Sequence, residues 1–364
     1  MVEQQPVLIL DLHNTLYDEV MEYGGAMDAA IGHFLEAAKD QGVAIDEGLV
    51  CRQLSEAHAR SGSDWDDDVW SGIAELQKLS RLGDVIDQAV ALRRKVSERL
   101  TRERAYKSTI EALITLKESG AAVYVATEAT ENAAGDGIVW LGLDGVLDGI
   151  YAWPFHNGHG KAGRTPIHRF PPDPERPGFS VQKPHPLILG SIILDVAKAE
   201  GRVPQNVMLE DVFDLTCDED LRVLARAMGG NAPSDGQRAQ VREVLRAVQT
   251  KLAARKGPYG AALDGIRRRC LYVGDSYFKD GLLAANADIP FVFAGYGTAI
   301  SDADTEVYDK CMKRLFSVTG WDGSLIRLKH EAGNVPEIKD RINPYFVCQE
   351  SLQELVEFMG RHSS

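Results

Sequence analysis

The sequence predicts an α/β fold built on a doubly wound parallel sheet, and three observations lead to this prediction. Short continuous apolar runs, typical of strands buried on both faces, recur along the chain. Segments with apolar residues spaced three to four apart, typical of amphipathic helices, separate these runs. Acidic or hydroxyl side chains end several of the runs. Ligands of such sheets bind at the carboxyl ends of the strands, so these polar residues are candidates for a functional site.

The strands and helices of the predicted core follow one another in a regular order. The first strand is the apolar run that ends in Asp11, and the last is weaker than the others. The predicted strands cover residues 7–11, 121–126, 270–273, 290–294 and 345–348. The predicted helices cover residues 109–118, 187–199, 282–287 and 352–359. This alternation places helices on both faces of one parallel sheet.

Two stretches interrupt the alternation and are interpreted as insertions. Residues 17–107 show only helical periodicity and predict an all-helical cap domain. Residues 208–268 predict a second, basic helical insertion. The α/β core then consists of residues 1–16, 108–207 and 269–364. Within it, residues 153–182 are rich in Pro, Gly and His and predict a long loop near the site.

Composition and charge narrow the function classes. No apolar run of the 364 residues approaches the roughly 18 needed to cross a bilayer, which argues against a membrane-embedded protein. The net charge of −14 opposes general binding of a nucleic-acid backbone. Residues 221–269 are different, with eleven Lys and Arg against three acids, and are a candidate surface for an anionic substrate or a partner. Five scattered cysteines and an N-terminus unlike a signal peptide predict a cytoplasmic protein.

The polar residues at the predicted strand ends form a chemically coherent set. Asp11 can attack phosphorus as a nucleophile, and the Thr127 hydroxyl and Lys183 ammonium can hold the transferring oxygens. Asp275, followed by Asp280, adds carboxylates of the kind that bind Mg²⁺. Together they predict a site for phosphoryl chemistry.

These four elements, in this order, resemble the motifs of the haloacid dehalogenase (HAD) superfamily, which is dominated by Mg²⁺-dependent phosphatases with a Rossmann-like core. The resemblance covers roughly half of the chain, and it implies that Asp11 is the nucleophile. It matches Thr127 and Lys183 to the second and third motifs, and Asp275 and Asp280 to the acids of the fourth. It also places the backbone carbonyl of His13 on the metal, so the implied metal site comprises Asp11, His13, Asp275 and Asp280. A helical cap after the first motif is a further family feature.

Position 13 departs from the phosphatase pattern, which has a second Asp two residues after the nucleophile. His13 stands there instead. An imidazole can do the same proton transfer as a general acid and base, but it can also be a structural or substrate-contacting group or a mark of lost catalysis. The sequence therefore predicts a Mg²⁺-dependent hydrolase of a small phosphorylated metabolite. The alternatives are cleavage of a carbon–phosphorus or other non-ester bond, and a catalytically impaired protein that binds a phosphorylated ligand.

Overall fold

The computed structural model describes residues 5–61, 83–154, 163–173, 180–181, 183–213, 257–299, 304–319 and 342–362. The chain divides into two compact units. Unit 1 comprises Met1–Leu16, Tyr106–Ala299 and Arg327–Ser364, and unit 2 comprises Tyr17–Ala105 and Ile300–Ile326. No helix among the described residues is long and apolar enough to cross a membrane.

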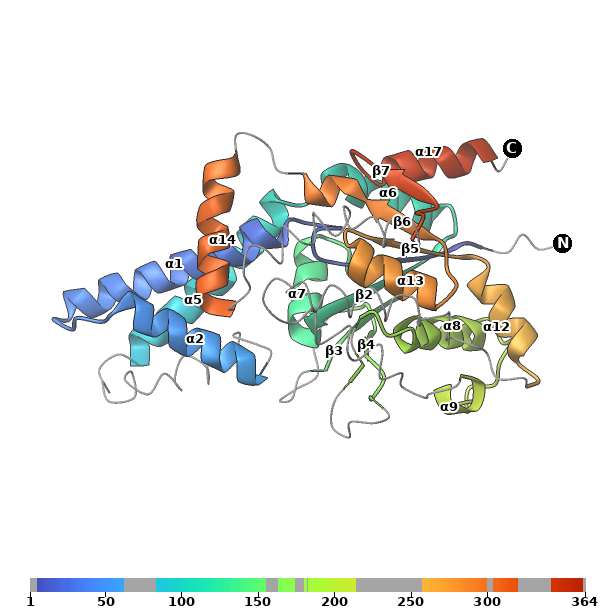
Figure 1. Cartoon of the computed structure of the whole chain (residues 1–364), viewed down its shortest axis with the longest axis horizontal. Coiled ribbons are helices and arrows are strands. Elements are labelled where there is room, and N and C mark those ends of the chain that lie inside the picture. The colour runs from blue at the N-terminus through green and yellow to red at the C-terminus, as the bar shows by residue number, and fades with distance from the viewer. Residues whose placement is uncertain are drawn as a thin grey trace, which may run out of the picture. The chain divides into compact units, whose positions relative to one another are not determined.

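Unit 1 is built on a seven-stranded sheet in the order β4-β3-β2-β1-β5-β6-β7, and every neighbouring pair of strands is parallel (Figure 1). The strands are β1 (Val7–Leu10), β2 (Ala122–Thr130), β3 (Gly149–Trp153), β4 (Ile167–Arg169), β5 (Cys270–Gly274), β6 (Phe291–Ala294) and β7 (Phe346–Cys348). The predicted doubly wound parallel sheet is thus confirmed.

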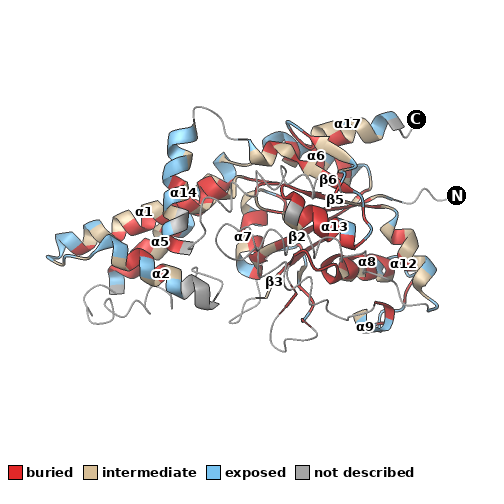
Figure 2. Ribbon diagram, viewed as in Figure 1, coloured by how far each residue is buried: buried red, intermediate tan, exposed pale blue. Residues whose placement is uncertain are grey.

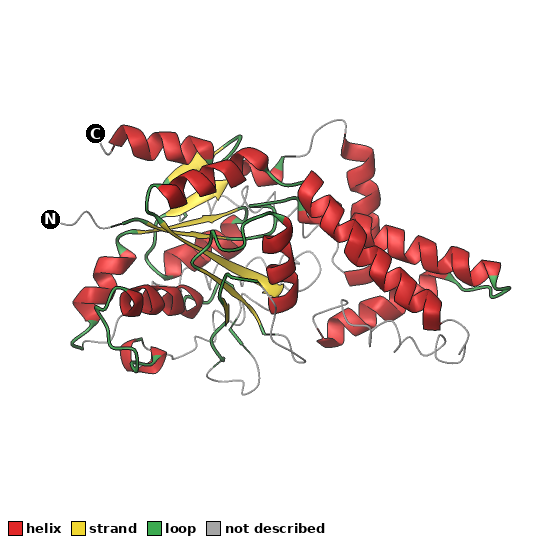
Figure 3. Ribbon diagram, turned by 180° about the vertical axis from the view of Figure 1, so that it is seen from behind, coloured by secondary structure: helices red, strands yellow, loops and turns green. Residues whose placement is uncertain are grey.

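Helices cover both faces of this sheet, as Figures 1 and 3 show. One face carries α8 (Leu187–Ala199), α12 (Gly260–Arg267) and α13 (Leu282–Asn286), whose apolar side chains join those of the strands in one core cluster. The other α-helices among the described residues of the unit are α6 (Lys107–Glu118), α7 (Glu131–Trp140), α9 (Leu209–Val212) and α17 (Gln353–His362). Two short irregular helices, the π-helix η1 (Tyr277–Gly281) and the 3₁₀-helix η2 (Gly295–Thr298), follow β5 and β6.

Burial explains why the strands read as continuous apolar runs. All four residues of β1 are buried, because it is a central strand with a helical layer on each face. Figure 2 shows many buried residues in the sheet and in the helices that cover it. Val7 and Ile9 join the core cluster formed with α8, α12 and α13. Leu8 and Leu10 alternate with them and therefore point to the opposite face.

All five strands predicted from the sequence are present, but two others were missed. β3 follows a turn and pairs with β2, and β4 lies within residues 153–182, which were predicted as a loop. β4 has only three residues and stands at the edge of the sheet, with a proline directly before it and prolines after its last residues. A strand this short, bounded by prolines, carries no periodic signal. Residues 155–162, 174–179 and 182 of the predicted loop lie outside the described residues.

The helices among the described residues of unit 2 are α1 (Glu19–Asp40), α2 (Glu47–Ser61), α5 (Gly83–Glu103) and α14 (Thr305–Thr319). The side chain of Asp18 caps α1 by accepting the N–H of Met21. A core cluster of buried apolar residues joins α1, α2 and α5, including Ile31, Phe34 and Leu54.

The grouping of α14 differs from the division drawn from the sequence, which assigned residues 269–364 to the core. α14 packs closely on α1, where a β-carbon at Gly24 would lie 2.5 Å from the carbonyl oxygen of Cys311. The Arg314 guanidinium also bonds to Asp28 on α1 and Glu47 on α2, at 3.2 and 2.7 Å. The sequence did not predict that α14 packs with the helices of unit 2, because α14 begins about 200 residues after the end of α5. Most of the predicted basic insertion 208–268, namely residues 214–256, lies outside the described residues.

Candidate active site

The candidate residues of the first, second and fourth motifs lie on or directly after three adjacent strands: Asp11 follows β1, Asp275 follows β5, and Thr127 lies in the last part of β2. Leu10 of β1 pairs with Val125 of β2 and Val273 of β5. Asp11 comes directly after Leu10, whereas Thr127 and Asp275 each come two residues after their paired valines. The register of the sheet therefore places these three residues near the same, carboxyl edge of the sheet.

Lys183 links the first and fourth motifs directly. Its ammonium lies 2.7 Å from Oδ1 of Asp11 and 2.8 Å from Oδ1 of Asp280. The side chains of Lys183 and Asp280 are almost completely buried, at 2% and 1% exposed, whereas that of Asp11 is 13% exposed. Of these three groups, Asp11 is thus the one that a ligand can reach.

Asp280 is held by three donors. Oδ1 accepts from Lys183 and from the Tyr272 hydroxyl at 3.0 Å, and Oδ2 accepts the N–H of Ser276 at 3.1 Å. Burial raises the pKa of Asp280, and the Lys183 ammonium opposes that rise. Burial also lowers the pKa of Lys183, but the charges of Asp11 and Asp280 outweigh it and hold that pKa well above its ordinary value. We regard the Lys183–Asp280 pair as ionic, because three donors satisfy an ionised carboxylate.

The site concentrates carboxylates of the type that bind hard cations. Oxygen atoms of Asp11, Asp275 and Asp280 all lie within 4.8 Å of one another. Both oxygens of Asp280 already accept hydrogen bonds from protein donors, so this carboxylate has little capacity left for a cation. Mg²⁺ is usually bound through one or two carboxylates together with oxygens of the substrate and water, so this set fits Mg²⁺. The prediction that Asp280 is also a metal ligand remains a prediction, and its contacts favour a role in holding Lys183.

The close approach of the Asp280 carboxylate explains why a glycine, Gly274, precedes Asp275. A β-carbon at position 274 would lie 2.4 Å from Cγ of Asp280 and 2.4 Å from its Oδ2. No real β-carbon approaches another heavy atom so closely. The glycine therefore leaves the space that the Asp280 carboxylate needs beneath the end of β5.

The loop that carries His13 is braced from another part of the sheet. Asn14 has a left-handed backbone with φ of 53°, and a β-carbon at Gly297 would lie 1.6 Å from the Asn14 carbonyl oxygen. The Tyr296 hydroxyl donates to the carbonyl oxygen of Thr15 at 3.0 Å. The loop after β6 thus holds the loop after β1 in place. His13 is half-buried in that loop, between Asp11 and Asn14.

Thr127 is buried, and its hydroxyl is placed to donate a hydrogen bond to a ligand. Its Oγ1 accepts the N–H of Ala129 at 3.1 Å. The register between β2 and β3 shifts between Ala126 and Thr130, so Thr127 lies in the stretch where the regular pairing is interrupted. The accepted hydrogen bond orients the hydroxyl and leaves its hydrogen to donate to a ligand oxygen.

Three residues of this neighbourhood escaped the sequence analysis, namely Glu128, Tyr272 and Gly297. Tyr272 lies inside an apolar run, where it resembles a packing residue. Glu128, directly after Thr127, could have been identified from the sequence, because its carboxylate interrupts a strand of mostly small and apolar residues. Gly297 is recognisable only once its proximity to Asn14 is known.

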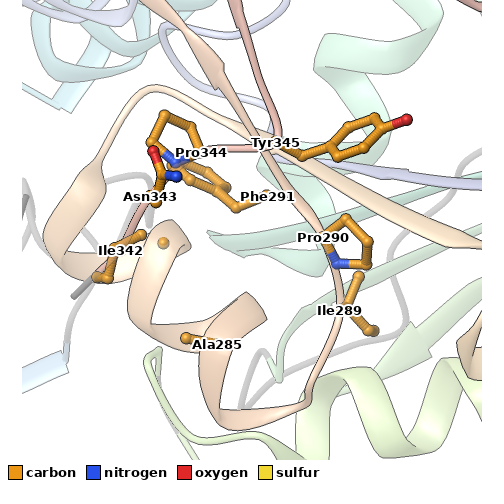
Figure 4. A pocket seen from close by; sticks show the side chains of 9 residues that line it. Ala285, Ile289, Pro290, Phe291, Ile342, Asn343, Pro344 and Tyr345 are labelled. Carbon is orange, nitrogen blue, oxygen red and sulfur yellow. The ribbon is translucent and has the colours of Figure 1, made fainter. Parts of the chain in front are cut away.

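A pocket of 470 Å³ lies elsewhere, at the amino ends of β6 and β7 (Figure 4). Its lining includes Ala285 of α13, Pro290 and Phe291 at the start of β6, and Pro344 and Tyr345 just before β7. The candidate active-site residues lie at the opposite, carboxyl ends of the strands. None of these candidate residues lines the pocket, although Gly281, which follows Asp280, does.

No family model and no curated protein matches the sequence. Solved structures do match it. The HAD-hydrolase YfnB of Bacillus subtilis, bound to magnesium, is 11% identical with a TM-score of 0.40, and the alignment covers 98% of this chain and 100% of that one. A 2-haloacid dehalogenase from Pseudomonas syringae pv. Tomato DC3000 is 11% identical with a TM-score of 0.40, covering 83% and 91% of the two chains.

The chain is similar in structure to HAD-type hydrolases. A further example is the haloacid dehalogenase-like protein SP0104 of Streptococcus pneumoniae, which is 15% identical with a TM-score of 0.35 and coverage of 97% and 98%. These similarities concern the fold. The side-chain geometry described above is what bears on the chemistry.

Proposed function

We propose that the chain is a Mg²⁺-dependent HAD-type hydrolase that cleaves a small phosphorylated metabolite through an aspartyl-phosphate intermediate on Asp11. One observation carries the proposal. A partly exposed carboxylate, Asp11, shares a buried ammonium, Lys183, with a second carboxylate, Asp280, at the carboxyl edge of a parallel sheet. This arrangement supplies a nucleophile and a cation that attracts an anionic group to it.

In the proposed reaction, a carboxylate oxygen of Asp11 attacks phosphorus and the bond from phosphorus to the leaving oxygen breaks. Water then attacks phosphorus of the aspartyl phosphate, the bond to the Asp11 oxygen breaks, and inorganic phosphate leaves. Lys183 and the Thr127 hydroxyl would hold the phosphoryl oxygens through both steps. Asp280 would keep the ammonium of Lys183 in place, as its 2.8 Å contact supports.

Asp11, Asp275 and the backbone carbonyl of His13 would hold Mg²⁺, with Asp280 nearby. When bound, the cation would balance the negative charge that the two carboxylates and the phosphoryl group bring together. The grouping of the Asp11, Asp275 and Asp280 oxygens within 4.8 Å supports this part of the proposal.

His13 would protonate the leaving oxygen in the first step and take a proton from water in the second. The same residue favours the second candidate function, cleavage of a carbon–phosphorus or other non-ester bond. In that chemistry the second Asp of the phosphatase motif has no required role, and this chain has none at position 13.

Reduced cysteines support a cytoplasmic location for this activity. Cys51, Cys270, Cys311 and Cys348 are free and buried, which is usual in a reducing compartment.

Release of phosphate from a panel of phosphate esters and phosphonates tests the proposal. We expect Mg²⁺-dependent release from esters and its loss in Asp11→Asn, which keeps the size of the side chain but removes the nucleophilic charge. Release from phosphonates alone would support the second candidate. No release from either class, in a protein that still binds phosphate, would refute both.

A further inference from the structure

We infer that Glu128, the residue after Thr127, is a positioning residue that fixes Lys183 by holding its backbone. This inference rests on the proposed function, in which Lys183 binds the transferring phosphoryl group. None of the four motifs includes Glu128, and its carboxylate contacts neither Asp11 nor the metal-binding carboxylates in any bond that the structure gives.

The two oxygens of Glu128 bind two different loops of the site. Oε1 accepts the backbone N–H of Lys183 at 3.2 Å. Oε2 accepts from the ammonium of Lys279 at 2.5 Å, and Lys279 lies in η1 next to Asp280. One side chain on β2 therefore connects the loop that carries Lys183 to the helix that carries Asp280.

These contacts form a closed ring. Glu128 holds the backbone of Lys183, the side chain of Lys183 reaches Asp280, and Lys279 beside Asp280 returns to Glu128. Lysine has a flexible four-carbon stem, so a contact at its ammonium alone defines its position poorly. With the main chain and the ammonium both fixed, Lys183 has little freedom to move away from Asp11.

The carbonyl group of Pro184, the next residue of this loop, is also fixed by a hydrogen bond. The side chain of Asn286 on α13 donates to the carbonyl oxygen of Pro184 at 3.2 Å, and both groups are buried. The loop at Lys183 is thus tied to β2 through Glu128 and to α13 through Asn286. Of these two ties, only the one through Glu128 ends on Lys183 itself.

The same chain offers a matched control at the far end of β2. Asp148 also accepts a backbone N–H, that of Val123, and a lysine ammonium, that of Lys117, each at 2.7 Å. Val123 lies near the amino end of β2, whereas the site lies at its carboxyl end. Removal of Asp148 therefore costs the same two types of bond without touching the site.

The experiment compares Glu128→Ala, Glu128→Gln and Asp148→Ala by two measurements. The first is turnover of 4-nitrophenyl phosphate with Mg²⁺. The second is the exchange rate of the Lys183 amide, followed by NMR with selective nitrogen-15 lysine labelling and assigned with Lys183→Arg. The second measurement does not depend on catalysis.

We expect Glu128→Ala to lower kcat by about 10- to 100-fold, with KM changed by less than about threefold, since displacement of a catalytic group by an ångström can have an effect of that size. The Lys183 amide should lose its protection in this variant. Glu128→Gln keeps an oxygen that can accept the N–H, so it should restore both amide protection and most of kcat. Asp148→Ala should lower stability but leave kcat and the Lys183 amide unchanged.

Wild-type kcat in Glu128→Ala would overturn the inference, and so would a Glu128→Gln variant as impaired as Glu128→Ala. An equal loss of kcat in Asp148→Ala would show that the loss in Glu128→Ala comes from general destabilisation of the protein, and this result would also overturn the inference. If the wild-type protein releases no phosphate, the proposed function fails, and the exchange measurement decides the inference alone. Loss of protection of the Lys183 amide in Glu128→Ala but not in Asp148→Ala would then support the inference that Glu128 holds the backbone of Lys183. Unchanged protection in Glu128→Ala would refute it.

Discussion

Replacement of Gly274 by alanine should disable the site by displacing Asp280. The new β-carbon would lie 2.4 Å from Cγ of Asp280, whereas ordinary van der Waals contacts begin at 3.4 Å. The carboxylate must therefore move by about 1 Å, a displacement that can cost about 10²-fold in rate when it reaches a catalytic group. Asp280 cannot move alone, because it binds the ammonium of Lys183 at 2.8 Å, and Lys183 in turn contacts Asp11.

The assay is turnover of 4-nitrophenyl phosphate with saturating Mg²⁺, together with thermal unfolding. Gly265→Ala is the matched control, since a β-carbon there meets only the end of the Arg202 side chain at 3.7 Å. In the helix α12 this control should be neutral or stabilising by up to about 1 kcal/mol, with unchanged kcat. We expect Gly274→Ala to remain folded and to lose about 10²-fold in kcat. Full activity in a folded Gly274→Ala protein would show that the position of Asp280 does not govern catalysis.

Three further predictions follow from the same geometry. Chelation by EDTA should abolish turnover, and Asp275→Asn should raise the Mg²⁺ concentration needed for half-maximal rate while the unfolding transition stays in place; full activity in EDTA would contradict the metal assignment. His13→Ala should slow hydrolysis of alkyl phosphates by about 10² to 10⁴ and of activated aryl phosphates much less, because only the former need a proton on the leaving oxygen; equal losses for both would argue against a general acid. Burial lowers the pKa of His185 from 6.5 to about 4, so its neutral form stabilises the fold above pH 6.5 and that contribution falls as the pH drops towards 4. Between pH 6.5 and 4 the free energy of unfolding, measured by urea titration, should fall by about 3 kcal/mol more in the wild-type protein than in His185→Asn, which keeps an acceptor for the N–H of Leu187. An equal fall in both proteins would show that the lowered pKa of His185 does not cause this pH dependence.

The sequence predicted every strand of the sheet except β3 and β4, which lie together at one end of it. β1, β2 and β5 are buried on both faces, so their apolar runs are continuous and end at polar residues that the structure brings together. β4 is short and lies at the edge, and it gave no such signal. The prediction that all of residues 269–364 belong to the core also missed the packing of α14 in unit 2, because a contact such as that between Gly24 and Cys311 spans almost 300 residues of sequence.

Within the site, the sequence identified the residues that bear charge but not those that hold them in place. Asp11 and Asp275 were found because carboxylates directly after apolar runs are conspicuous, and Lys183 and Asp280 because the four motifs occur in the order typical of the family that they resemble. The Tyr272 hydroxyl donates to Asp280, and yet Tyr272 resembles a core residue until the neighbouring strand and loop are known. Glu128 likewise acts through the backbone N–H of a residue 55 positions away, a partner that no local pattern specifies.

The stereochemical course at phosphorus tests the central claim, nucleophilic attack by Asp11, most directly. A 4-nitrophenyl phosphorothioate made chiral at phosphorus with oxygen-18 would be hydrolysed with Mg²⁺ in water enriched in oxygen-17, and the configuration of the released thiophosphate would be analysed. Two successive in-line displacements, first by Asp11 and then by water, invert the configuration twice and predict net retention. Net inversion would mean that water attacks the substrate directly, and it would contradict an aspartyl-phosphate intermediate.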